Sequence, residues 1–581
     1  MTGAVLTTGR PRRGPRVPLR PALTAVGAVV GLAVLVAALP WLWDSDPAAS
    51  VLRTLYPERE ADPAALEALR RELDLPSNPA VGAAQWLGGL VRGDLGTSWI
   101  TRGPVAPDVL GALGRSLTLS VAATLVAAVV AAVLLLPALL AGARGRTGGR
   151  GVPAGAAILA ALPEIVLGSV LVLVVAVGWR LLPSSGFAGP QYLVLPALAL
   201  GVPAGGLLAR VLAVSVDATL DEAWVRSWRS WGSSTARMVS GVARRAVAVA
   251  VPQIALLVVG LLGAAVAVEK LFDVPGIGTT ALDAVLAQDL PTVQAAVALL
   301  VLLGLGLGGL GVLVHRALLG PALAGRELAA GVEVVAPRRV PRSAVAVAAL
   351  LVALVVAGLP RDLAGDGGRR LAPPSWSLPF GADANGRDLF ARFAHGALLT
   401  LGSAVAISAI CLVVGLAVGI GARSARAGAA DVLNALPPVF VGLLVAAVAG
   451  PGLLGASAAV ALVGWVPLAV HARTLAAEAR ASGYVRAAEL VGASRRRIAR
   501  RHVLPAVVGP VSRHALARIP HVALALAALS FLGLGAPPDS PEWGAMLAVS
   551  QGYLERAPWT VLAPVVGLLG LAGVLASLRE R

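Results

Sequence analysis

The sequence predicts an all-α polytopic membrane protein with about twelve transmembrane helices, arranged as two six-helix halves. Of its 581 residues, 57% are hydrophobic and only 14% are charged, whereas soluble domains carry about 25% charged residues. Apolar runs of about 20 residues recur along the chain, and each is long enough to cross a bilayer core as a helix. Arginines gather in alternate loops between these runs, which indicates one orientation for the whole chain.

The apolar runs give the positions of the spans. In the first half they are residues 22–43, 116–142, 153–178, 192–214, 247–268 and 293–315, and in the second half 343–360, 398–422, 431–449, 453–472, 507–530 and 557–577. The loops assigned to the cytoplasm hold the arginines of 144–150, 226–245, 316–342, 423–426 and 473–501, whereas the external loops 44–108, 269–289 and 361–388 are acidic or mixed. Every loop therefore fits one topology in the cell membrane, with the N- and C-termini in the cytoplasm.

The chain divides into two halves of one plan. The first half covers residues 1–319, with an external segment over 44–115, and the second half covers residues 343–581. Because a six-span half starts and ends on the same side, the cytoplasmic linker 320–342 can join the two without an extra helix. We interpret the chain as a fusion protein of two once-separate subunits.

The external segment of the first half contains a helix signal. Asp62 is suited to the N-cap position and Pro63 to the first helical position. Leu66, Leu69 and Leu73 then follow on one face. These residues predict a short amphipathic helix with a structural role at the outer mouth.

Several classes of site are not supported by the sequence. The net charge of +17 comes from loop arginines without an aromatic-rich basic patch, so we expect no nucleic-acid partner. The single cysteine, Cys411, excludes an intrachain disulfide, and the histidines match no metal-ligand spacing. The only lysine, Lys270, follows a glutamate, so the chain has no G-x-x-x-x-G-K-[ST] phosphate loop. We therefore expect no enzyme activity, metal or cofactor in this chain, and ATP would have to be bound by partner subunits.

The basic segment GYVRAAELVGASRRRIARRHVLP, residues 483–505, lies between two apolar spans, and residues 221–248 are a looser counterpart. Its two adjacent alanines favour a helix that can closely approach a partner, and its glycine permits a turn. Its final proline is expected to begin the next span and fix the angle of re-entry. The residues singled out are Arg486, Ala487, Ala488, Gly492, Leu504 and Pro505. This pattern resembles the "EAA" coupling loop through which permeases of ABC transporters touch their ATPase.

Further motifs extend the resemblance. In the second half, FGADANGRD (380–388), LSFLGLG (529–535) and PEWG (541–544) are similar to the G-T-D-x-x-G-R-D, S-F-L-G-L-G and P-x-W-G motifs of permeases in dipeptide, oligopeptide and nickel importers. In the first half, RGDLGTS (92–98), LPSSG (182–186) and EKLFDVPGIG (269–278) are similar to motifs of the partner subunit. The resemblance implies an ABC type I importer permease fold. It also implies cytoplasmic ABC ATPase subunits, an extracytoplasmic solute-binding protein, and a peptide or nickel-type solute.

The two coupling loops depart from the family pattern. Arg486 replaces the leading glutamate, and the first loop carries Trp224, Trp228 and Trp231 before Gly232. The three tryptophans fall at helical spacing i, i+4, i+7, which predicts one aromatic face. One hypothesis is that this face docks in a matched ATPase pocket, and the alternative is that the tryptophans lie at the membrane interface.

Glu164 is a rare ionisable residue inside a span, where a charge costs about 2.5–3.5 kcal/mol on insertion scales. It is a candidate pathway residue that would meet a cationic group of the solute, or else a protonated, hydrogen-bonded or interfacial group. For the whole chain we expect an importer permease for peptides, or for nickel or nickel chelates. The alternatives are a twelve-span secondary transporter of the major-facilitator type and a non-transporting scaffold or degenerate permease.

Overall fold

The computed structural model describes residues 48, 51–52, 58, 62–72, 79–146, 154–319, 342–421 and 438–579. The predicted first span, 22–43, and the linker up to residue 341 lie outside the described residues. Within the described residues the protein is helical, and extended pairing is limited to two isolated bridges, Thr97–Pro104 and Ala382–Asp388. The predicted all-α class is therefore confirmed.

The helices of the first half follow the predicted order. They are α3 (Pro63–Glu72), α4 (Pro79–Arg92), α5 (Val105–Ala143), α6 (Ala154–Leu159), α7 (Glu164–Leu171), the π-helical turn η1 (Val172–Gly178), α8 (Pro190–Leu220), α9 (Ala223–Ser230), α10 (Thr235–Leu271), α11 (Ile277–Leu286) and α12 (Leu290–Leu319). The predicted amphipathic helix is α3. Its Leu69 is buried in a small cluster beside Trp99 and Ile100.

The second half repeats this order. Its helices are α13 (Arg342–Gly358), α14 (Leu389–Gly421), α16 (Pro438–Ala449), α17 (Leu453–Ala481), α18 (Gly483–Leu490), α19 (Arg495–Ile498), the π-helical turn η4 (Ala499–Val503), α20 (Leu504–Phe531), α21 (Trp543–Gln551) and α22 (Leu562–Arg579). Seven helical segments in the described residues are long and apolar enough to cross a membrane. The predicted spans 343–360 and 557–577 correspond to shorter apolar helices, as does the described part of 431–449.

One predicted feature of the spans was wrong. The span 153–178 is not one helix: it breaks between α6 and α7, because Pro163 lacks an N–H donor and disfavours helical geometry at the residue before it. Pro505 lies in the first turn of α20, as expected, although the helical path is continuous from Arg495 to Phe531. The π-helical turn η4 directly before α20 changes the hydrogen-bond register where Pro505 cannot donate.

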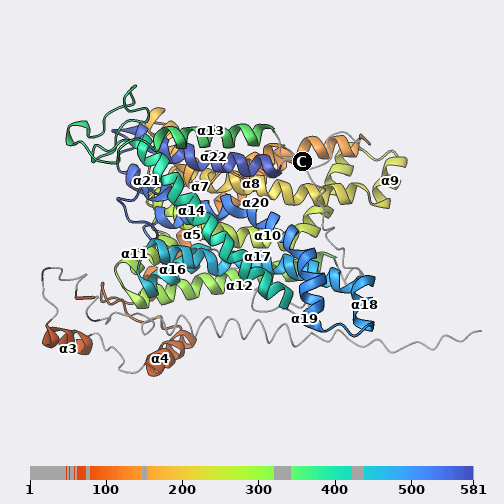
Figure 1. The fold of residues 1–581 in the computed structure, drawn as a ribbon, viewed down its shortest axis with the longest axis horizontal. Coiled ribbons are helices and arrows are strands. Elements are labelled where there is room, and N and C mark those ends of the chain that lie inside the picture. Colours follow the sequence, from red (N-terminus) through yellow and green to blue (C-terminus); the bar gives the residue numbers. More distant parts are fainter. Residues whose placement is uncertain are drawn as a thin grey trace, which may run out of the picture.

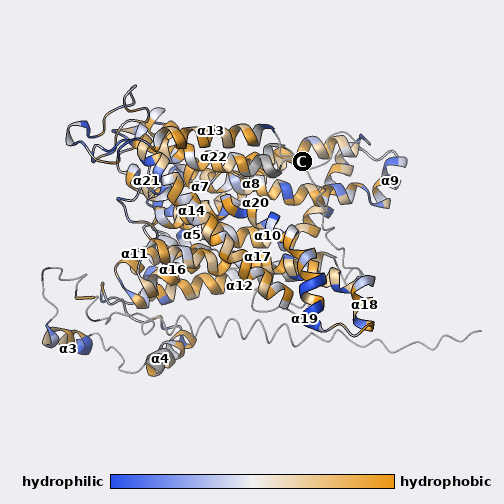
Figure 2. Ribbon diagram, in the orientation of Figure 1, coloured by the Kyte–Doolittle hydropathy of each residue, from blue (hydrophilic) through white to orange (hydrophobic). Residues whose placement is uncertain are grey.

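The long helices lie side by side along the long axis of the molecule (Figure 1). Helices α9, α18 and α19 project at one end, and α11 and α21 lie at the opposite end (Figure 1). Apolar residues dominate the bundle, whereas hydrophilic residues gather at its two ends (Figure 2). The two halves are interleaved: α16 contacts α10, α11 and α12, and α22 contacts α6 and α7.

Candidate functional site

The two coupling loops have the same backbone design, 260 residues apart. At the end of α18, Gly492 has a φ of 79°, its N–H donates to the carbonyl of Glu489 at 3.0 Å, and the next N–H donates to the carbonyl of Ala488 at 3.0 Å. At the end of α9, Gly232 has a φ of 68° and its N–H donates to the carbonyl of Arg229 at 3.1 Å. Both are Schellman turns, which place glycine in the left-handed region.

A serine restarts the helix after each turn. The hydroxyl of Ser494 accepts from the N–H of Arg497 at 3.3 Å, and that of Ser234 accepts from the N–H of Arg237 at 3.4 Å. Serine is a preferred N-cap because its oxygen satisfies a free N–H of the first turn. Each loop is thus a short helix, a fixed turn and a capped helix. Such an element can transmit force between a partner and the membrane bundle.

The second coupling loop presents an apolar tip. Leu490 is 90% exposed and Val491 is 85% exposed, while Val485 on the opposite face of α18 is buried and anchors the helix. Arg486 and Ala487 are exposed, as are the arginines that begin α19. An exposed apolar tip surrounded by arginines is suited to a partner with an apolar groove and an acidic rim.

The tryptophans of the first loop do not form one exposed face. The rings of Trp224 and Trp228 meet edge to face, with centroids 4.9 Å apart, and both pack onto α10 beside Gly241. The indole N–H of Trp224 also donates to Glu222 at 2.6 Å. Trp231 alone is 78% exposed. Two of the rings therefore fill the space between α9 and α10, and docking of this loop on an ATPase stays a prediction.

At the opposite end of the molecule, a buried carboxylate anchors α11. Glu269 accepts from the N–H groups of Gly278 at 3.0 Å and Thr279 at 3.1 Å, and from the hydroxyl of Ser116 on α5. The Ser116 oxygen in turn accepts from the N–H of Ile277 at 2.8 Å. The carboxyl group therefore satisfies free N–H groups at the start of α11.

The second half builds the same anchor from a different position in the chain. Glu542 accepts from the N–H of Ala545 at 3.0 Å and from the hydroxyl of Thr400 on α14 at 3.1 Å. The Thr400 oxygen accepts from the N–H of Trp543 at 3.3 Å. Glu542 is fully buried, which raises the pKa of its carboxyl above the ordinary value. Glu269 ends α10, whereas Glu542 directly precedes α21, yet both carboxylates hold the start of the following short helix.

The two external motifs of the second half are joined by arginines. Arg392, buried in the first turn of α14, donates to Asp383 at 3.0 Å and to the carbonyl of Ser540 at 2.7 Å. Arg387 donates to Asp383 at 2.8 Å and pairs with Asp539 at 3.5 Å. The segments 380–388 and 537–544, which are distant in sequence, are therefore tied together by these contacts.

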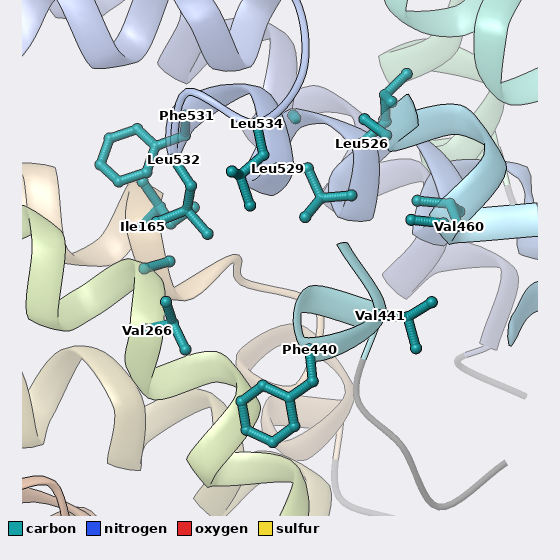
Figure 3. Close-up of a cluster of buried hydrophobic side chains, with 14 of the residues drawn as sticks. Ile165, Val266, Phe440, Val441, Val460, Leu526, Leu529, Phe531, Leu532 and Leu534 are labelled. Carbon is teal, nitrogen blue, oxygen red and sulfur yellow. The ribbon is translucent and has the colours of Figure 1, made fainter. Parts of the chain in front are cut away.

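The halves meet in a cluster of buried apolar side chains (Figure 3). Ile165 of α7 and Val266 of α10 come from the first half, and Phe440 of α16 and Leu529 of α20 come from the second. All four side chains are buried. They fill the space between the halves at this level.

The described residues also line two hollows of a size that suits small molecules. One hollow of about 480 Å³, here called the outer hollow after the predicted topology, is lined by Leu182, Pro183 and Ser184 of the LPSSG motif, by Arg180 and Gln191, and by Glu555 of the second half. A second cavity, of about 410 Å³, lies within the first half and is lined by Glu164, the residue singled out in the sequence.

Comparison with known proteins decides the family. A family model described as a binding-protein-dependent transport system inner membrane component matches residues 134–320 and again residues 414–579, more than half of the chain. The chain belongs to this family. It carries the family's domain twice, so the predicted tandem permease is confirmed, as is its place among multi-pass proteins of the inner membrane.

Several relatives named as peptide permeases are similar to this permease. The di/tripeptide transport system permease protein DppC of Pseudomonas aeruginosa is 36% identical over 219 residues, which cover 36% of this chain and 72% of the relative. A putative peptide permease protein of Brucella ovis is 36% identical over 222 residues, which cover 36% of this chain and 73% of the relative. The dipeptide transport system permease protein DppC of Alkalihalophilus pseudofirmus is 33% identical over 202 residues, covering 34% and 66%.

The structure of the permease shows where the predicted residues of the second coupling loop lie and which exposed residues the prediction missed. Ala488 is half-buried, and Leu504 and Pro505 lie on the continuous helix beyond the coupling turn. Leu490 and Val491 form the exposed tip, although only their neighbours resembled the family motif. The role of Arg392 could not be predicted from the sequence. An arginine at the start of an apolar run is usually interpreted as a charge at the membrane interface, and its partners here are distant in the chain.

Proposed function

We propose that this permease imports peptides across the cell membrane, powered by ATP that separate subunits bind and hydrolyse. The observation that carries the proposal is the pair of coupling loops at one end of the bundle. Both have the same backbone design, which is a short helix, a Schellman turn and a serine-capped helix. Two such elements are suited to two ATPase subunits, whose closure would push on both halves together. Residues 1–319 and 343–581 would be the two working halves, with the coupling ends and both termini in the cytoplasm.

The proposed cycle begins at the outer end. A solute-binding protein outside the cell would release its peptide at the outer hollow, the apolar cluster between the halves would open, and the solute would pass inward. The relatives are named as permeases for peptides, dipeptides or di/tripeptides, which supports a peptide as the solute. Nickel or a nickel chelate is the second candidate, and it rests on the resemblance alone. The family match disfavours a secondary transporter of the major-facilitator type.

Reconstitution tests this function. The tagged permease would be purified with its ATPase subunits, placed in proteoliposomes and supplied with the binding protein, and uptake of a labelled dipeptide and a labelled nickel chelate would be measured. We expect dipeptide uptake that requires ATP and stops when the ATPase is inactivated. Uptake driven by an ion gradient without ATP would contradict the proposal, and ATP-dependent uptake of nickel alone would move the solute to the second candidate.

A further inference from the structure

The second cavity, which Glu164 lines and which we call the inner cavity, has an unusual composition for a site among apolar membrane spans. It lies among α7, α8 and α10, and its two polar side chains are Glu164 and Gln253. The rest of its wall is apolar or glycine, including Leu207, Leu257 and Leu261. Its volume of about 410 Å³ falls within the range of small-molecule sites, roughly 300–1,000 Å³.

The backbone is irregular where the carboxylate enters the cavity. Glu164 begins α7 immediately after the break in the third span, and the cavity residues of α8 and α10 come from the middle of those helices. Irregular backbone at membrane depth is tolerated only where it is buried in protein or lines a cavity. The break therefore places a carboxylate, together with the N-terminus of a helix, at a mid-membrane cavity.

The cavity borders the surface along which the halves must separate. The next residue, Ile165, belongs to the apolar cluster between the halves (Figure 3). Ala161, in the break itself, packs against Ala572 of α22 in the second half. Separation of the halves would therefore alter the wall of the cavity and expose it to a passing solute.

The carboxylate lacks a cationic partner in the described part of the chain. No ion pair and no side-chain donor to Glu164 occurs among the described residues. An unpaired carboxylate in an apolar setting is costly, and intramembrane charges mark solute or ion pathways. A cation supplied by the solute would complete the site.

We propose that this cavity is a transient subsite for a primary ammonium group of the solute, with Glu164 as its counter-ion and the amide oxygen of Gln253 as a second acceptor. The inference rests on the proposed import function and narrows its substrate class to solutes that carry such a group. An ammonium group has three donors, which suits two acceptors on opposite helices. The apolar remainder of the wall would accept side chains of differing shape.

Transport by charge-exchanged variants tests the subsite. In the reconstituted complex, E164Q is expected to lower ATP-dependent uptake of a dipeptide about tenfold or more, the factor that one charge-assisted hydrogen bond supplies. The double variant E164Q/Q253E returns a carboxylate to the same cavity from α10 and is expected to recover much of the uptake. Wild-type uptake by E164Q would overturn the inference while leaving the import function intact. Absence of uptake by the wild-type complex would instead contradict the function.

A labelling measurement covers the case in which E164Q does not assemble. A cysteine at Leu257, in a Cys411→Ser background, would be treated with an ammonium-bearing and a neutral methanethiosulfonate during ATP turnover. Relative to their rates with free cysteine, we expect the ammonium reagent to react about tenfold faster, since the carboxylate concentrates the cation. E164D should retain most of this preference. Equal relative rates, or no reaction with either reagent, would overturn the subsite.

Discussion

Glu269 and Glu542 are each at most 1% exposed, and each holds the first N–H groups of a short outer helix together with a hydroxyl from a long helix. The sequence motifs contained both residues, but they do not align between the halves, because one ends α10 and the other precedes α21. Sequence reasoning could therefore identify the two motifs and not their shared task. That task depends on where the chain returns in space.

The Glu542 carboxyl gives the fold a specific pH dependence. Burial raises its pKa in the folded protein, so the folded state holds its proton to higher pH than the unfolded state, whose glutamates titrate at about pH 4.3. The protonated Glu542 carboxyl therefore contributes fully to the free energy of unfolding below about pH 4.3. This contribution is lost as the pH rises through the raised pKa of the folded state. We expect the melting temperature of the wild type relative to E542Q to be highest at about pH 4 and below, and to fall as the pH rises through the raised pKa. A pH-independent difference between the two melting curves would contradict this assignment.

Gly544 is required by a close approach between helices. A Cβ atom there would lie 2.0 Å from the carbonyl oxygen of Ala527 on α20. We expect G544A to destabilise the protein by about 1–3 kcal/mol, the usual cost of overpacking. G552A, at the other end of α21, is the matched control, because its nearest neighbour would be 4.0 Å away. Thermal unfolding in detergent measures both, and equal melting temperatures would show that α21 does not pack as tightly as described.

The long membrane-spanning helices were the elements most predictable from the sequence, because their apolar length is a local property. The spans within α5, α8, α10, α14 and α17 followed from apolar length alone. The broken third span was missed because its apolar composition continues through Pro163, and only the three-dimensional setting shows that the break lines a cavity. The coupling turns were predicted in the second half from Gly492, whereas the equivalent design around Gly232 was obscured by the tryptophans.

Both coupling helices should touch an ATPase. Ser227 and Ala487 occupy equivalent exposed positions on α9 and α18, 260 residues apart. In a Cys411→Ser background, we expect S227C and A487C each to cross-link to an ATPase subunit through a short bifunctional reagent. The native cysteine is buried, so its removal only lowers the background.

A cysteine at Leu313, exposed on the long helix α12, is the control and should not cross-link to the ATPase. Cross-linking at A487C alone would mean that the first loop does not dock. The Trp231 side chain would then have another use, such as contact with lipid. Cross-linking at neither position would contradict the role of both elements.

At the scale of the molecule, the charge alternation of the loops predicted two halves, and the family match confirms that the domain is repeated. The sequence did not predict how the halves interleave. The contacts of α16 with α10 to α12, and of α22 with α6 and α7, are made by small and apolar residues whose local pattern resembles that of lipid-facing residues. Partner choice between helices of similar composition depends on shape, which only the assembled structure provides.

This interleaving predicts that the halves can assemble without a covalent link. If the chain is divided between residues 330 and 331 and both parts are co-expressed, we expect them to copurify and to support dipeptide uptake. Each half expressed alone should be depleted from the membrane, since the apolar cluster at Phe440 and Val266 would lose its partner. Copurification that depends on the intact linker would contradict an interface of this kind.

The central claim is that the permease works through an ATPase held at its coupling turns, and affinity purification from the native membrane in mild detergent tests it most directly. We predict that an ATPase subunit copurifies with the wild type and is lost with G492V, because valine at a φ of 79° costs about 1–3 kcal/mol of backbone strain. G483A, at the start of the same helix, where a Cβ meets open space, should retain it. No ATPase with the wild type, or equal amounts with G492V, would contradict the account.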